Sequence, residues 1–390
     1  MNYIDSTHTS IACRGKYQLC DLDVPGMWLQ RAASNCYSCL DPSRNVCKSP
    51  SHLTYNQYLV GLKPGAAQAN LLSLKAFLMT QDLRRARMVL WVDDPAAVYT
   101  NETAAFFDAF AEHITIKRFD YQQEIRGTLW EGDPFFRNGS HVRSFMPMAG
   151  AWSDVVRILL LHKYGDFWMD NDVVLYTDVT HLLDTSYQFV MRWMNLHIMR
   201  MQPESKLTHR AMRLATLLPL DHPRFQQEVM DKLCKPNGYM PAHPMYKGTD
   251  IYNSCLHRVL LRVNNTGPPG AVLYDLPLGW WDHDWAGCFN TRKAINDSDW
   301  RRVAGSFLAM HNRYPKEPDL GDAQPPSPLR RVVKIVDDFF ALCASADCMP
   351  VDGMPLLAYE GIRDAPGTVR RAALRRLSQH LQAALPRPPA

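Results

Sequence analysis

The chain has 390 residues, of which 46% are hydrophobic, so it is long and apolar enough to bury a large core. Its formal net charge of +4 is too small to indicate a nucleic-acid partner, and no dense run of Lys and Arg precedes the C-terminal tail. No apolar stretch is long enough to span a membrane, and residues 1–12 lack the apolar segment of a signal peptide. We therefore expect either a membrane anchor outside this chain or a soluble protein.

The N-terminal region is rich in cysteine and in turn-forming residues. Residues 1–50 contain five of the ten cysteines, namely Cys13, Cys20, Cys36, Cys39 and Cys47. Their spacing favours a small region held by disulfides over a zinc site, because a second Cys-x-x-Cys and suitable histidines are missing nearby. Reduced cysteines in a cytosolic protein are the alternative. Further along the chain, Cys343 and Cys348 are close enough in sequence to form a local pair.

Asn-x-Ser/Thr sequences support the secretory pathway. Chance would give roughly one or two in a chain of this length. This sequence has them at Asn101, Asn138, Asn264 and Asn296. Together with the cysteines, they favour the Golgi lumen or another secretory compartment over the cytoplasm.

Strands and helices alternate after the cysteine-rich region. We expect strands at residues 55–62, 87–92 and 114–119, and helices at residues 66–83 and 103–113. This alternation predicts an α/β protein with a mainly parallel sheet. Ligands of such sheets bind beyond the carboxyl ends of the strands, where Asp93 follows the second strand. A simple turn at the end of the strand is the alternative for Asp93 and Asp94.

The centre of the sequence predicts a helix, a sharp stop and a strand. Apolar residues repeat at helical spacing before Gly165, which stands where a left-handed helix end is expected. Residues 167–176 then have the composition of a buried strand, interrupted by Asp170, Asn171 and Asp172. Two carboxylates in a buried run are costly unless a cation or another partner compensates for their charge. In an extended chain Asp170 and Asp172 would share one face and converge on one ion.

This central stretch carries a resemblance to a known family. A pattern of roughly Ser-Asp-x-x-Arg, then Leu-x-x-Tyr-Gly-Gly-x-Tyr-x-Asp-x-Asp, is met by Ser153, Asp154, Arg157, Leu161, Tyr164, Gly165, Trp168, Asp170 and Asp172. The stretch resembles the sugar-binding region of glycosyltransferases with a DxD motif, of the family 32 and α1,4-glycosyltransferase type. Asp166 replaces the second glycine and Trp168 the tyrosine. Asp tolerates a left-handed turn better than most residues do.

The resemblance covers roughly residues 53–315 and implies a GT-A fold, with a single Rossmann-like sheet that is mixed, mainly parallel and flanked by helices. It implies a metal-dependent hexosyl- or N-acetylhexosaminyltransferase that retains the anomeric configuration. The sugar would pass from a nucleotide-diphosphate donor, a UDP-sugar above all, to a hydroxyl group of a glycan or glycoprotein. Mn²⁺, or Mg²⁺, would bind Asp170 and Asp172, with His311 as a third ligand.

The same resemblance suggests the remaining site residues. Asp170, Asp172 and Asp250 would be catalytic, and the donor would contact Asp93, Asp154, Arg157, Asn171, Asn195 and Trp281. Several of these residues have a plainer alternative. Asp154 and Arg157 are spaced for an ordinary ion pair within a helix, and Asp250 for a charge at a helix start. Trp281 lies among three tryptophans that would serve equally well in a core, and a lone strand histidine such as His311 is more often structural.

The predicted domain organisation has three parts. A cysteine-rich segment spans residues 1–50, a catalytic domain residues 51–320, and a Pro- and Arg-rich tail residues 321–390, with helices at 330–342 and 369–385. Two other functions stay open at this point. One is a nucleotide- or glycan-binding partner subunit of the same fold with little turnover. The other is a toxin-like protein glucosyltransferase of the cytoplasm, which occupied glycosylation sites would exclude.

Overall fold

The computed structural model describes residues 53–60, 67–145, 149–180, 188–191, 197–216, 273–276, 293–306, 309–311, 326–343 and 353–363. Of the predicted features, the cysteine-rich segment, the helix at 369–385 and the residues Asn195, Asp250 and Trp281 lie outside these ranges. None of the described helices is long and apolar enough to cross a bilayer.

A seven-stranded sheet forms the centre of the described structure, in the order β3-β2-β1-β4-β7-β6-β8. The strands are β1 (Leu53–Leu59), β2 (Ala86–Val92), β3 (Ile114–Arg118), β4 (Asp166–Met169), β6 (Gln188–Met191), β7 (Ile198–Met201) and β8 (Leu273–Leu276). Strands β3, β2, β1 and β4 are mutually parallel, and β8 is parallel to β6. Strand β7 runs antiparallel to both of its neighbours. The prediction of a mixed, mainly parallel sheet is confirmed.

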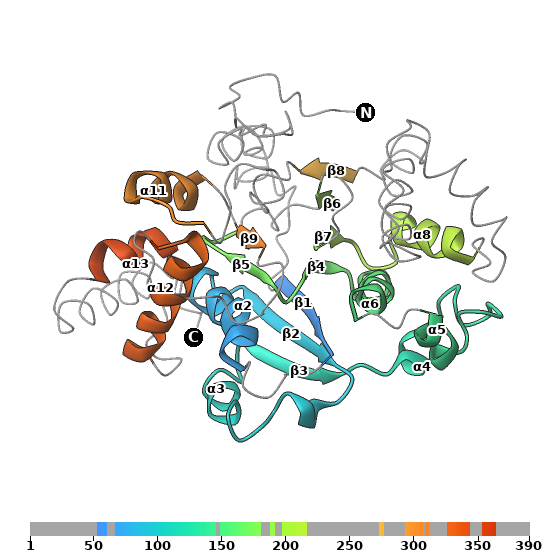
Figure 1. The fold of residues 1–390 in the computed structure, drawn as a ribbon. Coiled ribbons are helices and arrows are strands. Elements are labelled where there is room, and N and C mark those ends of the chain that lie inside the picture. The colour runs from blue at the N-terminus through green and yellow to red at the C-terminus, as the bar shows by residue number, and fades with distance from the viewer. Residues whose placement is uncertain are drawn as a thin grey trace, which may run out of the picture.

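Helices cover both faces of this sheet. They are α2 (Ala67–Thr80), α3 (Ala104–Ala109), α4 (Tyr121–Glu124), α5 (Gly139–Phe145), α6 (Ala149–Tyr164), α8 (Lys206–Thr216), α11 (Asp297–Ser306), α12 (Pro328–Leu342) and α13 (Leu356–Arg363), with a short 3-10 helix at Pro95–Ala97. Figure 1 shows α2, α12 and α13 on one side of the sheet and α6 and α8 on the other. The α/β class predicted from the alternating pattern is therefore confirmed.

Each face of the sheet has its own core, because successive strand residues point to opposite faces. In β4, Phe167 and Met169 pack with α2, whereas Trp168 packs with α6. A sheet covered on both faces needs strands that are apolar on both faces, and β4 is buried along Phe167, Trp168 and Met169. The charged residues that directly follow β4 are therefore where burial along the chain is interrupted.

A second, two-stranded sheet departs from the single sheet that the resemblance implied. Strand β5 (Val173–Leu175) pairs antiparallel with β9 (Ala309–His311), and neither strand joins the large sheet. Residues of both strands, such as Val174 and Met310, are fully buried in the core that also contains α2. The small sheet is thus packed onto the large one through α2.

The helices beyond residue 321 contribute to this same core. In α12, Val332, Ile335 and Phe339 are buried together with Phe77 of α2. Lys75 of α2 also forms an ion pair with Asp337 (2.9 Å). The predicted helix at 330–342 is confirmed as α12, and it packs onto the domain that it was expected to follow as a tail. Where the domain boundaries lie stays a prediction.

Cys343 follows α12, is buried and is disulfide-bonded. Its predicted partner, Cys348, lies outside the described residues.

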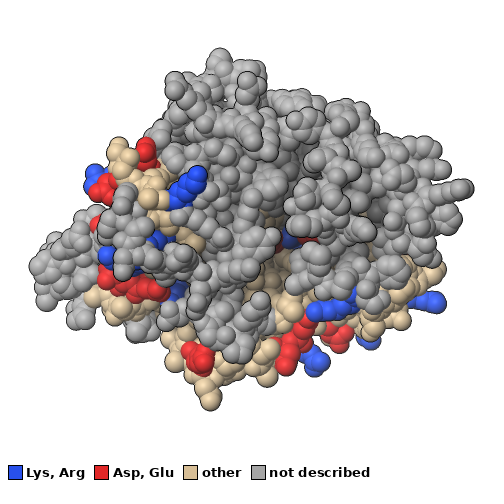
Figure 2. Space-filling model, in the orientation of Figure 1, with Lys and Arg blue, Asp and Glu red and all other residues tan. Residues whose placement is uncertain are grey.

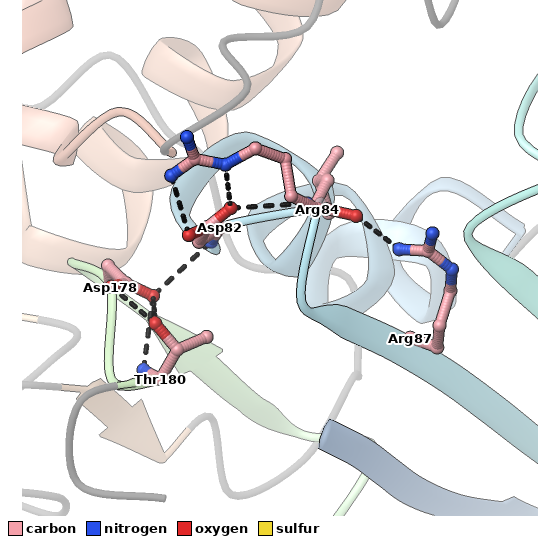
Figure 3. A network of polar contacts seen from close by, with 6 residues as sticks. Asp82, Arg84, Arg87, Asp178 and Thr180 are labelled. Atoms are coloured by element: carbon pink, nitrogen blue, oxygen red, sulfur yellow. Dashed lines mark hydrogen bonds and ion pairs between the residues drawn. The ribbon is translucent and has the colours of Figure 1, made fainter. Parts of the chain in front are cut away.

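A polar network connects the end of α2 with the segment after β5 (Figure 3). Two nitrogens of the Arg84 guanidinium donate to the two oxygens of Asp82, each at 2.9 Å. The backbone N–H of Asp82 donates to Asp178 (3.3 Å), which also accepts hydrogen bonds from the backbone and hydroxyl of Thr180. These contacts fix the segment after β5 against α2, at the turn that leads into β2.

Charges are mixed on the described surface. Figure 2 shows acidic and basic side chains interspersed over the described elements on this face of the molecule, without a large patch of one sign. This distribution agrees with the small net charge of +4.

Candidate metal and donor site

The Asp170-Asn171-Asp172 sequence forms a turn that leads from β4 to β5. The backbone N–H of Val173 donates to the carbonyl oxygen of Asp170 (3.0 Å) and closes the turn. The N–H of Asp170 donates to the carbonyl oxygen of His197 (2.8 Å), next to β7. The prediction of one strand over residues 167–176 is therefore wrong, since β4 ends at Met169 and β5 starts at Val173 in another sheet.

This correction changes how the two carboxylates come together. Asp170 and Asp172 are the first and third residues of a turn and do not share a strand face. Both are partly exposed, whereas Met169 and Val173 on either side are fully buried. Asp and Asn favour turns because their side chains bond to nearby backbone, and exposure avoids the cost of burying charge. The pair remains at the carboxyl end of β4, as predicted.

The direction of β4 is set by two residues with left-handed backbone. Gly165 and Asp166 both have φ of 68°. A Cβ atom on Gly165 would lie 2.5 Å from Cδ of Pro203, so only glycine fits. Asp166 occupies the position of the second family glycine, and its carboxylate accepts a hydrogen bond from the backbone N–H of Thr54 in β1 (2.9 Å). The expected tolerance of Asp for this turn is confirmed.

Arg157 connects α6 to the turn. Its Nη1 lies 3.1 Å from Asp154 Oδ1, and its Nη2 lies 2.7 Å from Asp170 Oδ1. The side chains of Arg157 and Asp154 are each only 4% exposed. The ion pair within the helix, which was the plainer alternative, is thus present and extends to the first carboxylate of the DxD motif. The buried guanidinium of Arg157 thus partly neutralises the negative charges of Asp154 and Asp170.

Trp168, which departs from the family pattern, also contacts the turn. Its indole Nε1 donates to Asp170 Oδ1 at 2.6 Å. The same oxygen accepts from Arg157, and the guanidinium of Arg157 lies over the indole ring at 5.3 Å. The spacing of two residues at the end of a buried strand was the available signal, because residues i and i+2 lie on the same side of a strand.

His311 is brought next to the turn by the small sheet. Its Cα pairs with that of Val173, the residue that directly follows Asp172. The structure describes the backbone of His311 but not its side chain. Among the described residues no group of three or more potential ligand side chains is gathered. The two carboxylates, Asp170 and Asp172, nevertheless fit the preference of Mn²⁺ for oxygen ligands.

Asp93 belongs to a second polar cluster, at the carboxyl end of β2. It accepts hydrogen bonds from the hydroxyl of Tyr58 (2.6 Å) and from Arg143 Nη1 of α5 (2.9 Å). Trp152 Nε1 donates to the Tyr58 oxygen (2.8 Å). Burial and the neighbouring carboxylate of Asp93 raise the pKa of Tyr58 well above its usual range, so its hydroxyl stays protonated. No local sequence pattern pointed to Arg143 or Trp152.

Asp93 and Asp94 have different surroundings. The carboxylate of Asp94 accepts from the N–H of Ala96 (3.0 Å) and caps the short helix Pro95–Ala97, as expected for a simple turn. Asp93 is 31% exposed and its partner Arg143 40% exposed, so both can reach a ligand. Since β1 lies between β2 and β4, these two strands are about 10 Å apart across the sheet, at about 4.8 Å per strand spacing.

No family model matches the sequence. No characterised protein matches it in sequence. Solved structures are similar over part of the chain. A glycosyltransferase called PaToxG has a TM-score of 0.37 and 13% identity, over 63% of this chain and 82% of that one. The bifunctional glycosyltransferase WbbM has a TM-score of 0.38 and 9% identity, over 68% of this chain and 46% of that one, and mouse xyloside xylosyltransferase 1 has a TM-score of 0.37 and 12% identity, over 68% and 98%. This chain thus spans about half of WbbM. Similarities this low do not identify an activity.

Proposed function

We propose that this protein is a metal-dependent glycosyltransferase with a GT-A fold, which transfers a sugar with retention from a nucleotide-diphosphate donor to a hydroxyl of a glycan or glycoprotein. One observation carries the proposal. The Asp170–Asp172 turn lies at the carboxyl end of β4, is held there by buried Arg157 and by Trp168, and is adjacent to the strand that ends in His311. Ligands of sheets of this kind bind at that edge.

The residues present fit a bound divalent cation. Asp170 and Asp172 would hold it, with His311 as the third protein ligand. When bound, the cation would neutralise the charge that develops on the departing diphosphate. Arg157 keeps a permanent positive charge beside Asp170 and holds that carboxylate in place. Asn171 and Asp154 lie next to these residues, which is where contacts to the donor sugar and phosphates are proposed.

The second cluster would accommodate the nucleoside. Asp93, Arg143 and Tyr58 offer a partly exposed carboxylate, a guanidinium and a protonated hydroxyl. The cluster follows β2 and the turn follows β4, two strands about 10 Å apart across the sheet, and this arrangement suits a molecule that carries its base and ribose at one end and its phosphates at the other. Contacts from Asn195, Trp281 and Asp250 stay part of the proposal, because these residues lie outside the described ranges.

We propose the Golgi lumen, or another secretory compartment, as the site of action. Asn101, Asn138 and Asn296 are all exposed, so a glycan can be attached without unfolding the domain. The protein expressed in a secretory host should lose mass on treatment with peptide N-glycosidase F. An unchanged mass would favour the cytoplasmic alternative.

The decisive experiment is a screen of UDP- and GDP-sugars for hydrolysis with and without Mn²⁺. We expect one donor to be hydrolysed only with the metal, with UDP-galactose, UDP-N-acetylglucosamine and UDP-glucose as first choices. Asp172→Asn keeps the shape of the turn and removes one charge. It should lower the rate about a hundredfold, since a lost electrostatic contact of this kind costs about 3 kcal/mol.

The result that contradicts the proposal is equally defined. If no donor is hydrolysed, and calorimetry shows that wild type and Asp172→Asn bind nucleotide and Mn²⁺ alike, the catalytic function is wrong. If wild type binds donor and metal through Asp172 without turnover, the protein is a binding partner of the same fold.

A further inference from the structure

Two hydrogen-bond donors of different kinds converge on one oxygen of Asp170. The Arg157 Nη2 atom lies 2.7 Å from Oδ1, and the indole Nε1 of Trp168 lies 2.6 Å from the same atom. Hydrogen bonds to an ionised carboxylate are short and stronger than those between neutral groups. The backbone of Asp170 is also fixed at both ends, through its N–H to His197 and through its carbonyl to Val173. The first carboxylate of the DxD motif is thus oriented by the protein alone.

The two hydrogen-bond donors, Arg157 and Trp168, are not equivalent. Arg157 carries a full positive charge, which opposes a cation at the carboxylate that it holds. An indole has a single N–H, donates only and carries no charge. Trp168 can therefore orient Asp170 with little electrostatic penalty to a second cation. Its ring is fully buried in the core that contains the apolar residues of α6, and the Arg157 guanidinium lies over it at 5.3 Å, so the direction of its N–H is fixed.

We propose that Trp168 is a positioning residue that pre-orients Asp170 for the divalent cation through its indole N–H. This inference rests on the proposed function. Replacing a residue that hydrogen-bonds to a metal ligand typically lowers the metal affinity by about 10–100-fold. Trp168→Phe removes the N–H and leaves the Arg157–Asp170 ion pair in place. Trp168→Tyr, the residue of the family pattern, has nearly the size of Phe and restores a donor group.

Trp300 supplies a matched control. It is 1% exposed, and its Nε1 donates to a carboxylate oxygen of Glu360 at 2.6 Å, so Trp300→Phe makes the same chemical change elsewhere. Trp300 belongs to the core on the α2 side of the sheet, whereas Trp168 belongs to the core on the α6 side. Both Phe variants should lose thermal stability. Only the change at Trp168 should alter metal binding.

The first measurement is the affinity for Mn²⁺ alone. The electron paramagnetic resonance signal of the unbound ion reports how much metal is bound. We expect Trp168→Phe to bind about tenfold more weakly or worse, Trp168→Tyr to stay closer to wild type, and Trp300→Phe to equal wild type. Unchanged affinity in Trp168→Phe overturns the inference. Equal losses in Trp168→Phe and Trp168→Tyr also overturn it, because the ring volume would then be responsible.

A second measurement tests the order of events. The indole ¹H–¹⁵N resonance that disappears in Trp168→Phe should show the shift of a strong hydrogen bond before any metal is added. It should move little on titration with diamagnetic Mg²⁺. A resonance that reaches the hydrogen-bonded position only with Mg²⁺ overturns pre-orientation.

The failure of the inference and that of the proposed function are distinguishable. If Asp172→Asn abolishes Mn²⁺ binding and Trp168→Phe does not weaken it, the metal site stands and the inference fails. If wild type itself does not bind Mn²⁺, both fail.

Discussion

Removing Arg157 tests the internal charge balance of the site. Arg157→Met keeps much of the length and removes the cation shared by Asp154 and Asp170. Asp154 has a side chain only 4% exposed, whereas Asp170 is 23% exposed and partly screened by water. Breaking a buried pair by removing one partner costs about 3–5 kcal/mol. That is a large part of the about 5–15 kcal/mol by which proteins are stable, so the variant should be clearly destabilised.

The assay is chemical denaturation in EDTA, so that bound metal does not contribute to stability. Lys75→Met is the control, because it removes the half-exposed ion pair with Asp337 and should cost at most about 1 kcal/mol. In an Asp154→Asn background the Arg157 change should cost at least about 1 kcal/mol less, since neighbouring charged residues couple. If Arg157→Met is no more destabilising than Lys75→Met, the buried ion pair does not stabilise the fold more than the half-exposed one.

Two further predictions concern the C-terminal end of α6. Gly165→Ala should destabilise the fold by more than about 2 kcal/mol, because φ is 68° and the added Cβ would lie 2.5 Å from Pro203. Gly127→Ala should cost only about 1 kcal/mol, since φ is 78° but nothing lies within 4 Å of its Cβ, and equal losses in thermal denaturation would contradict the steric argument. Burial, and then the neighbouring His209, lower the pKa of His162, so the unfolded chain binds more protons and stability should fall as the pH drops below about 6.5. His162→Gln should flatten this part of the stability profile, and an unchanged slope would contradict the assignment.

The sequence predicted the features that depend on neighbouring residues. Strands β1, β2 and β3 were expected within a few residues of their observed bounds, and the end of helix α6 was expected at Gly165. Apolar periodicity and turn chemistry are local properties, and they are sufficient for these elements. The candidate site was proposed from the same kind of local pattern, because two aspartates in an apolar run conflict with burial wherever the run lies in the fold.

Only the tertiary structure decided how the chain continues after Asp170. The apolar composition of residues 167–176 is equally good for one strand or two, so it did not reveal the turn or the pairing of β5 with β9. The convergence of Arg157 and Trp168 on one oxygen depends on how α6 packs against β4, and the packing of α12 on α2 joins residues far apart in sequence. Contacts of this kind form only when distant elements bury apolar surface together, and no local pattern records them.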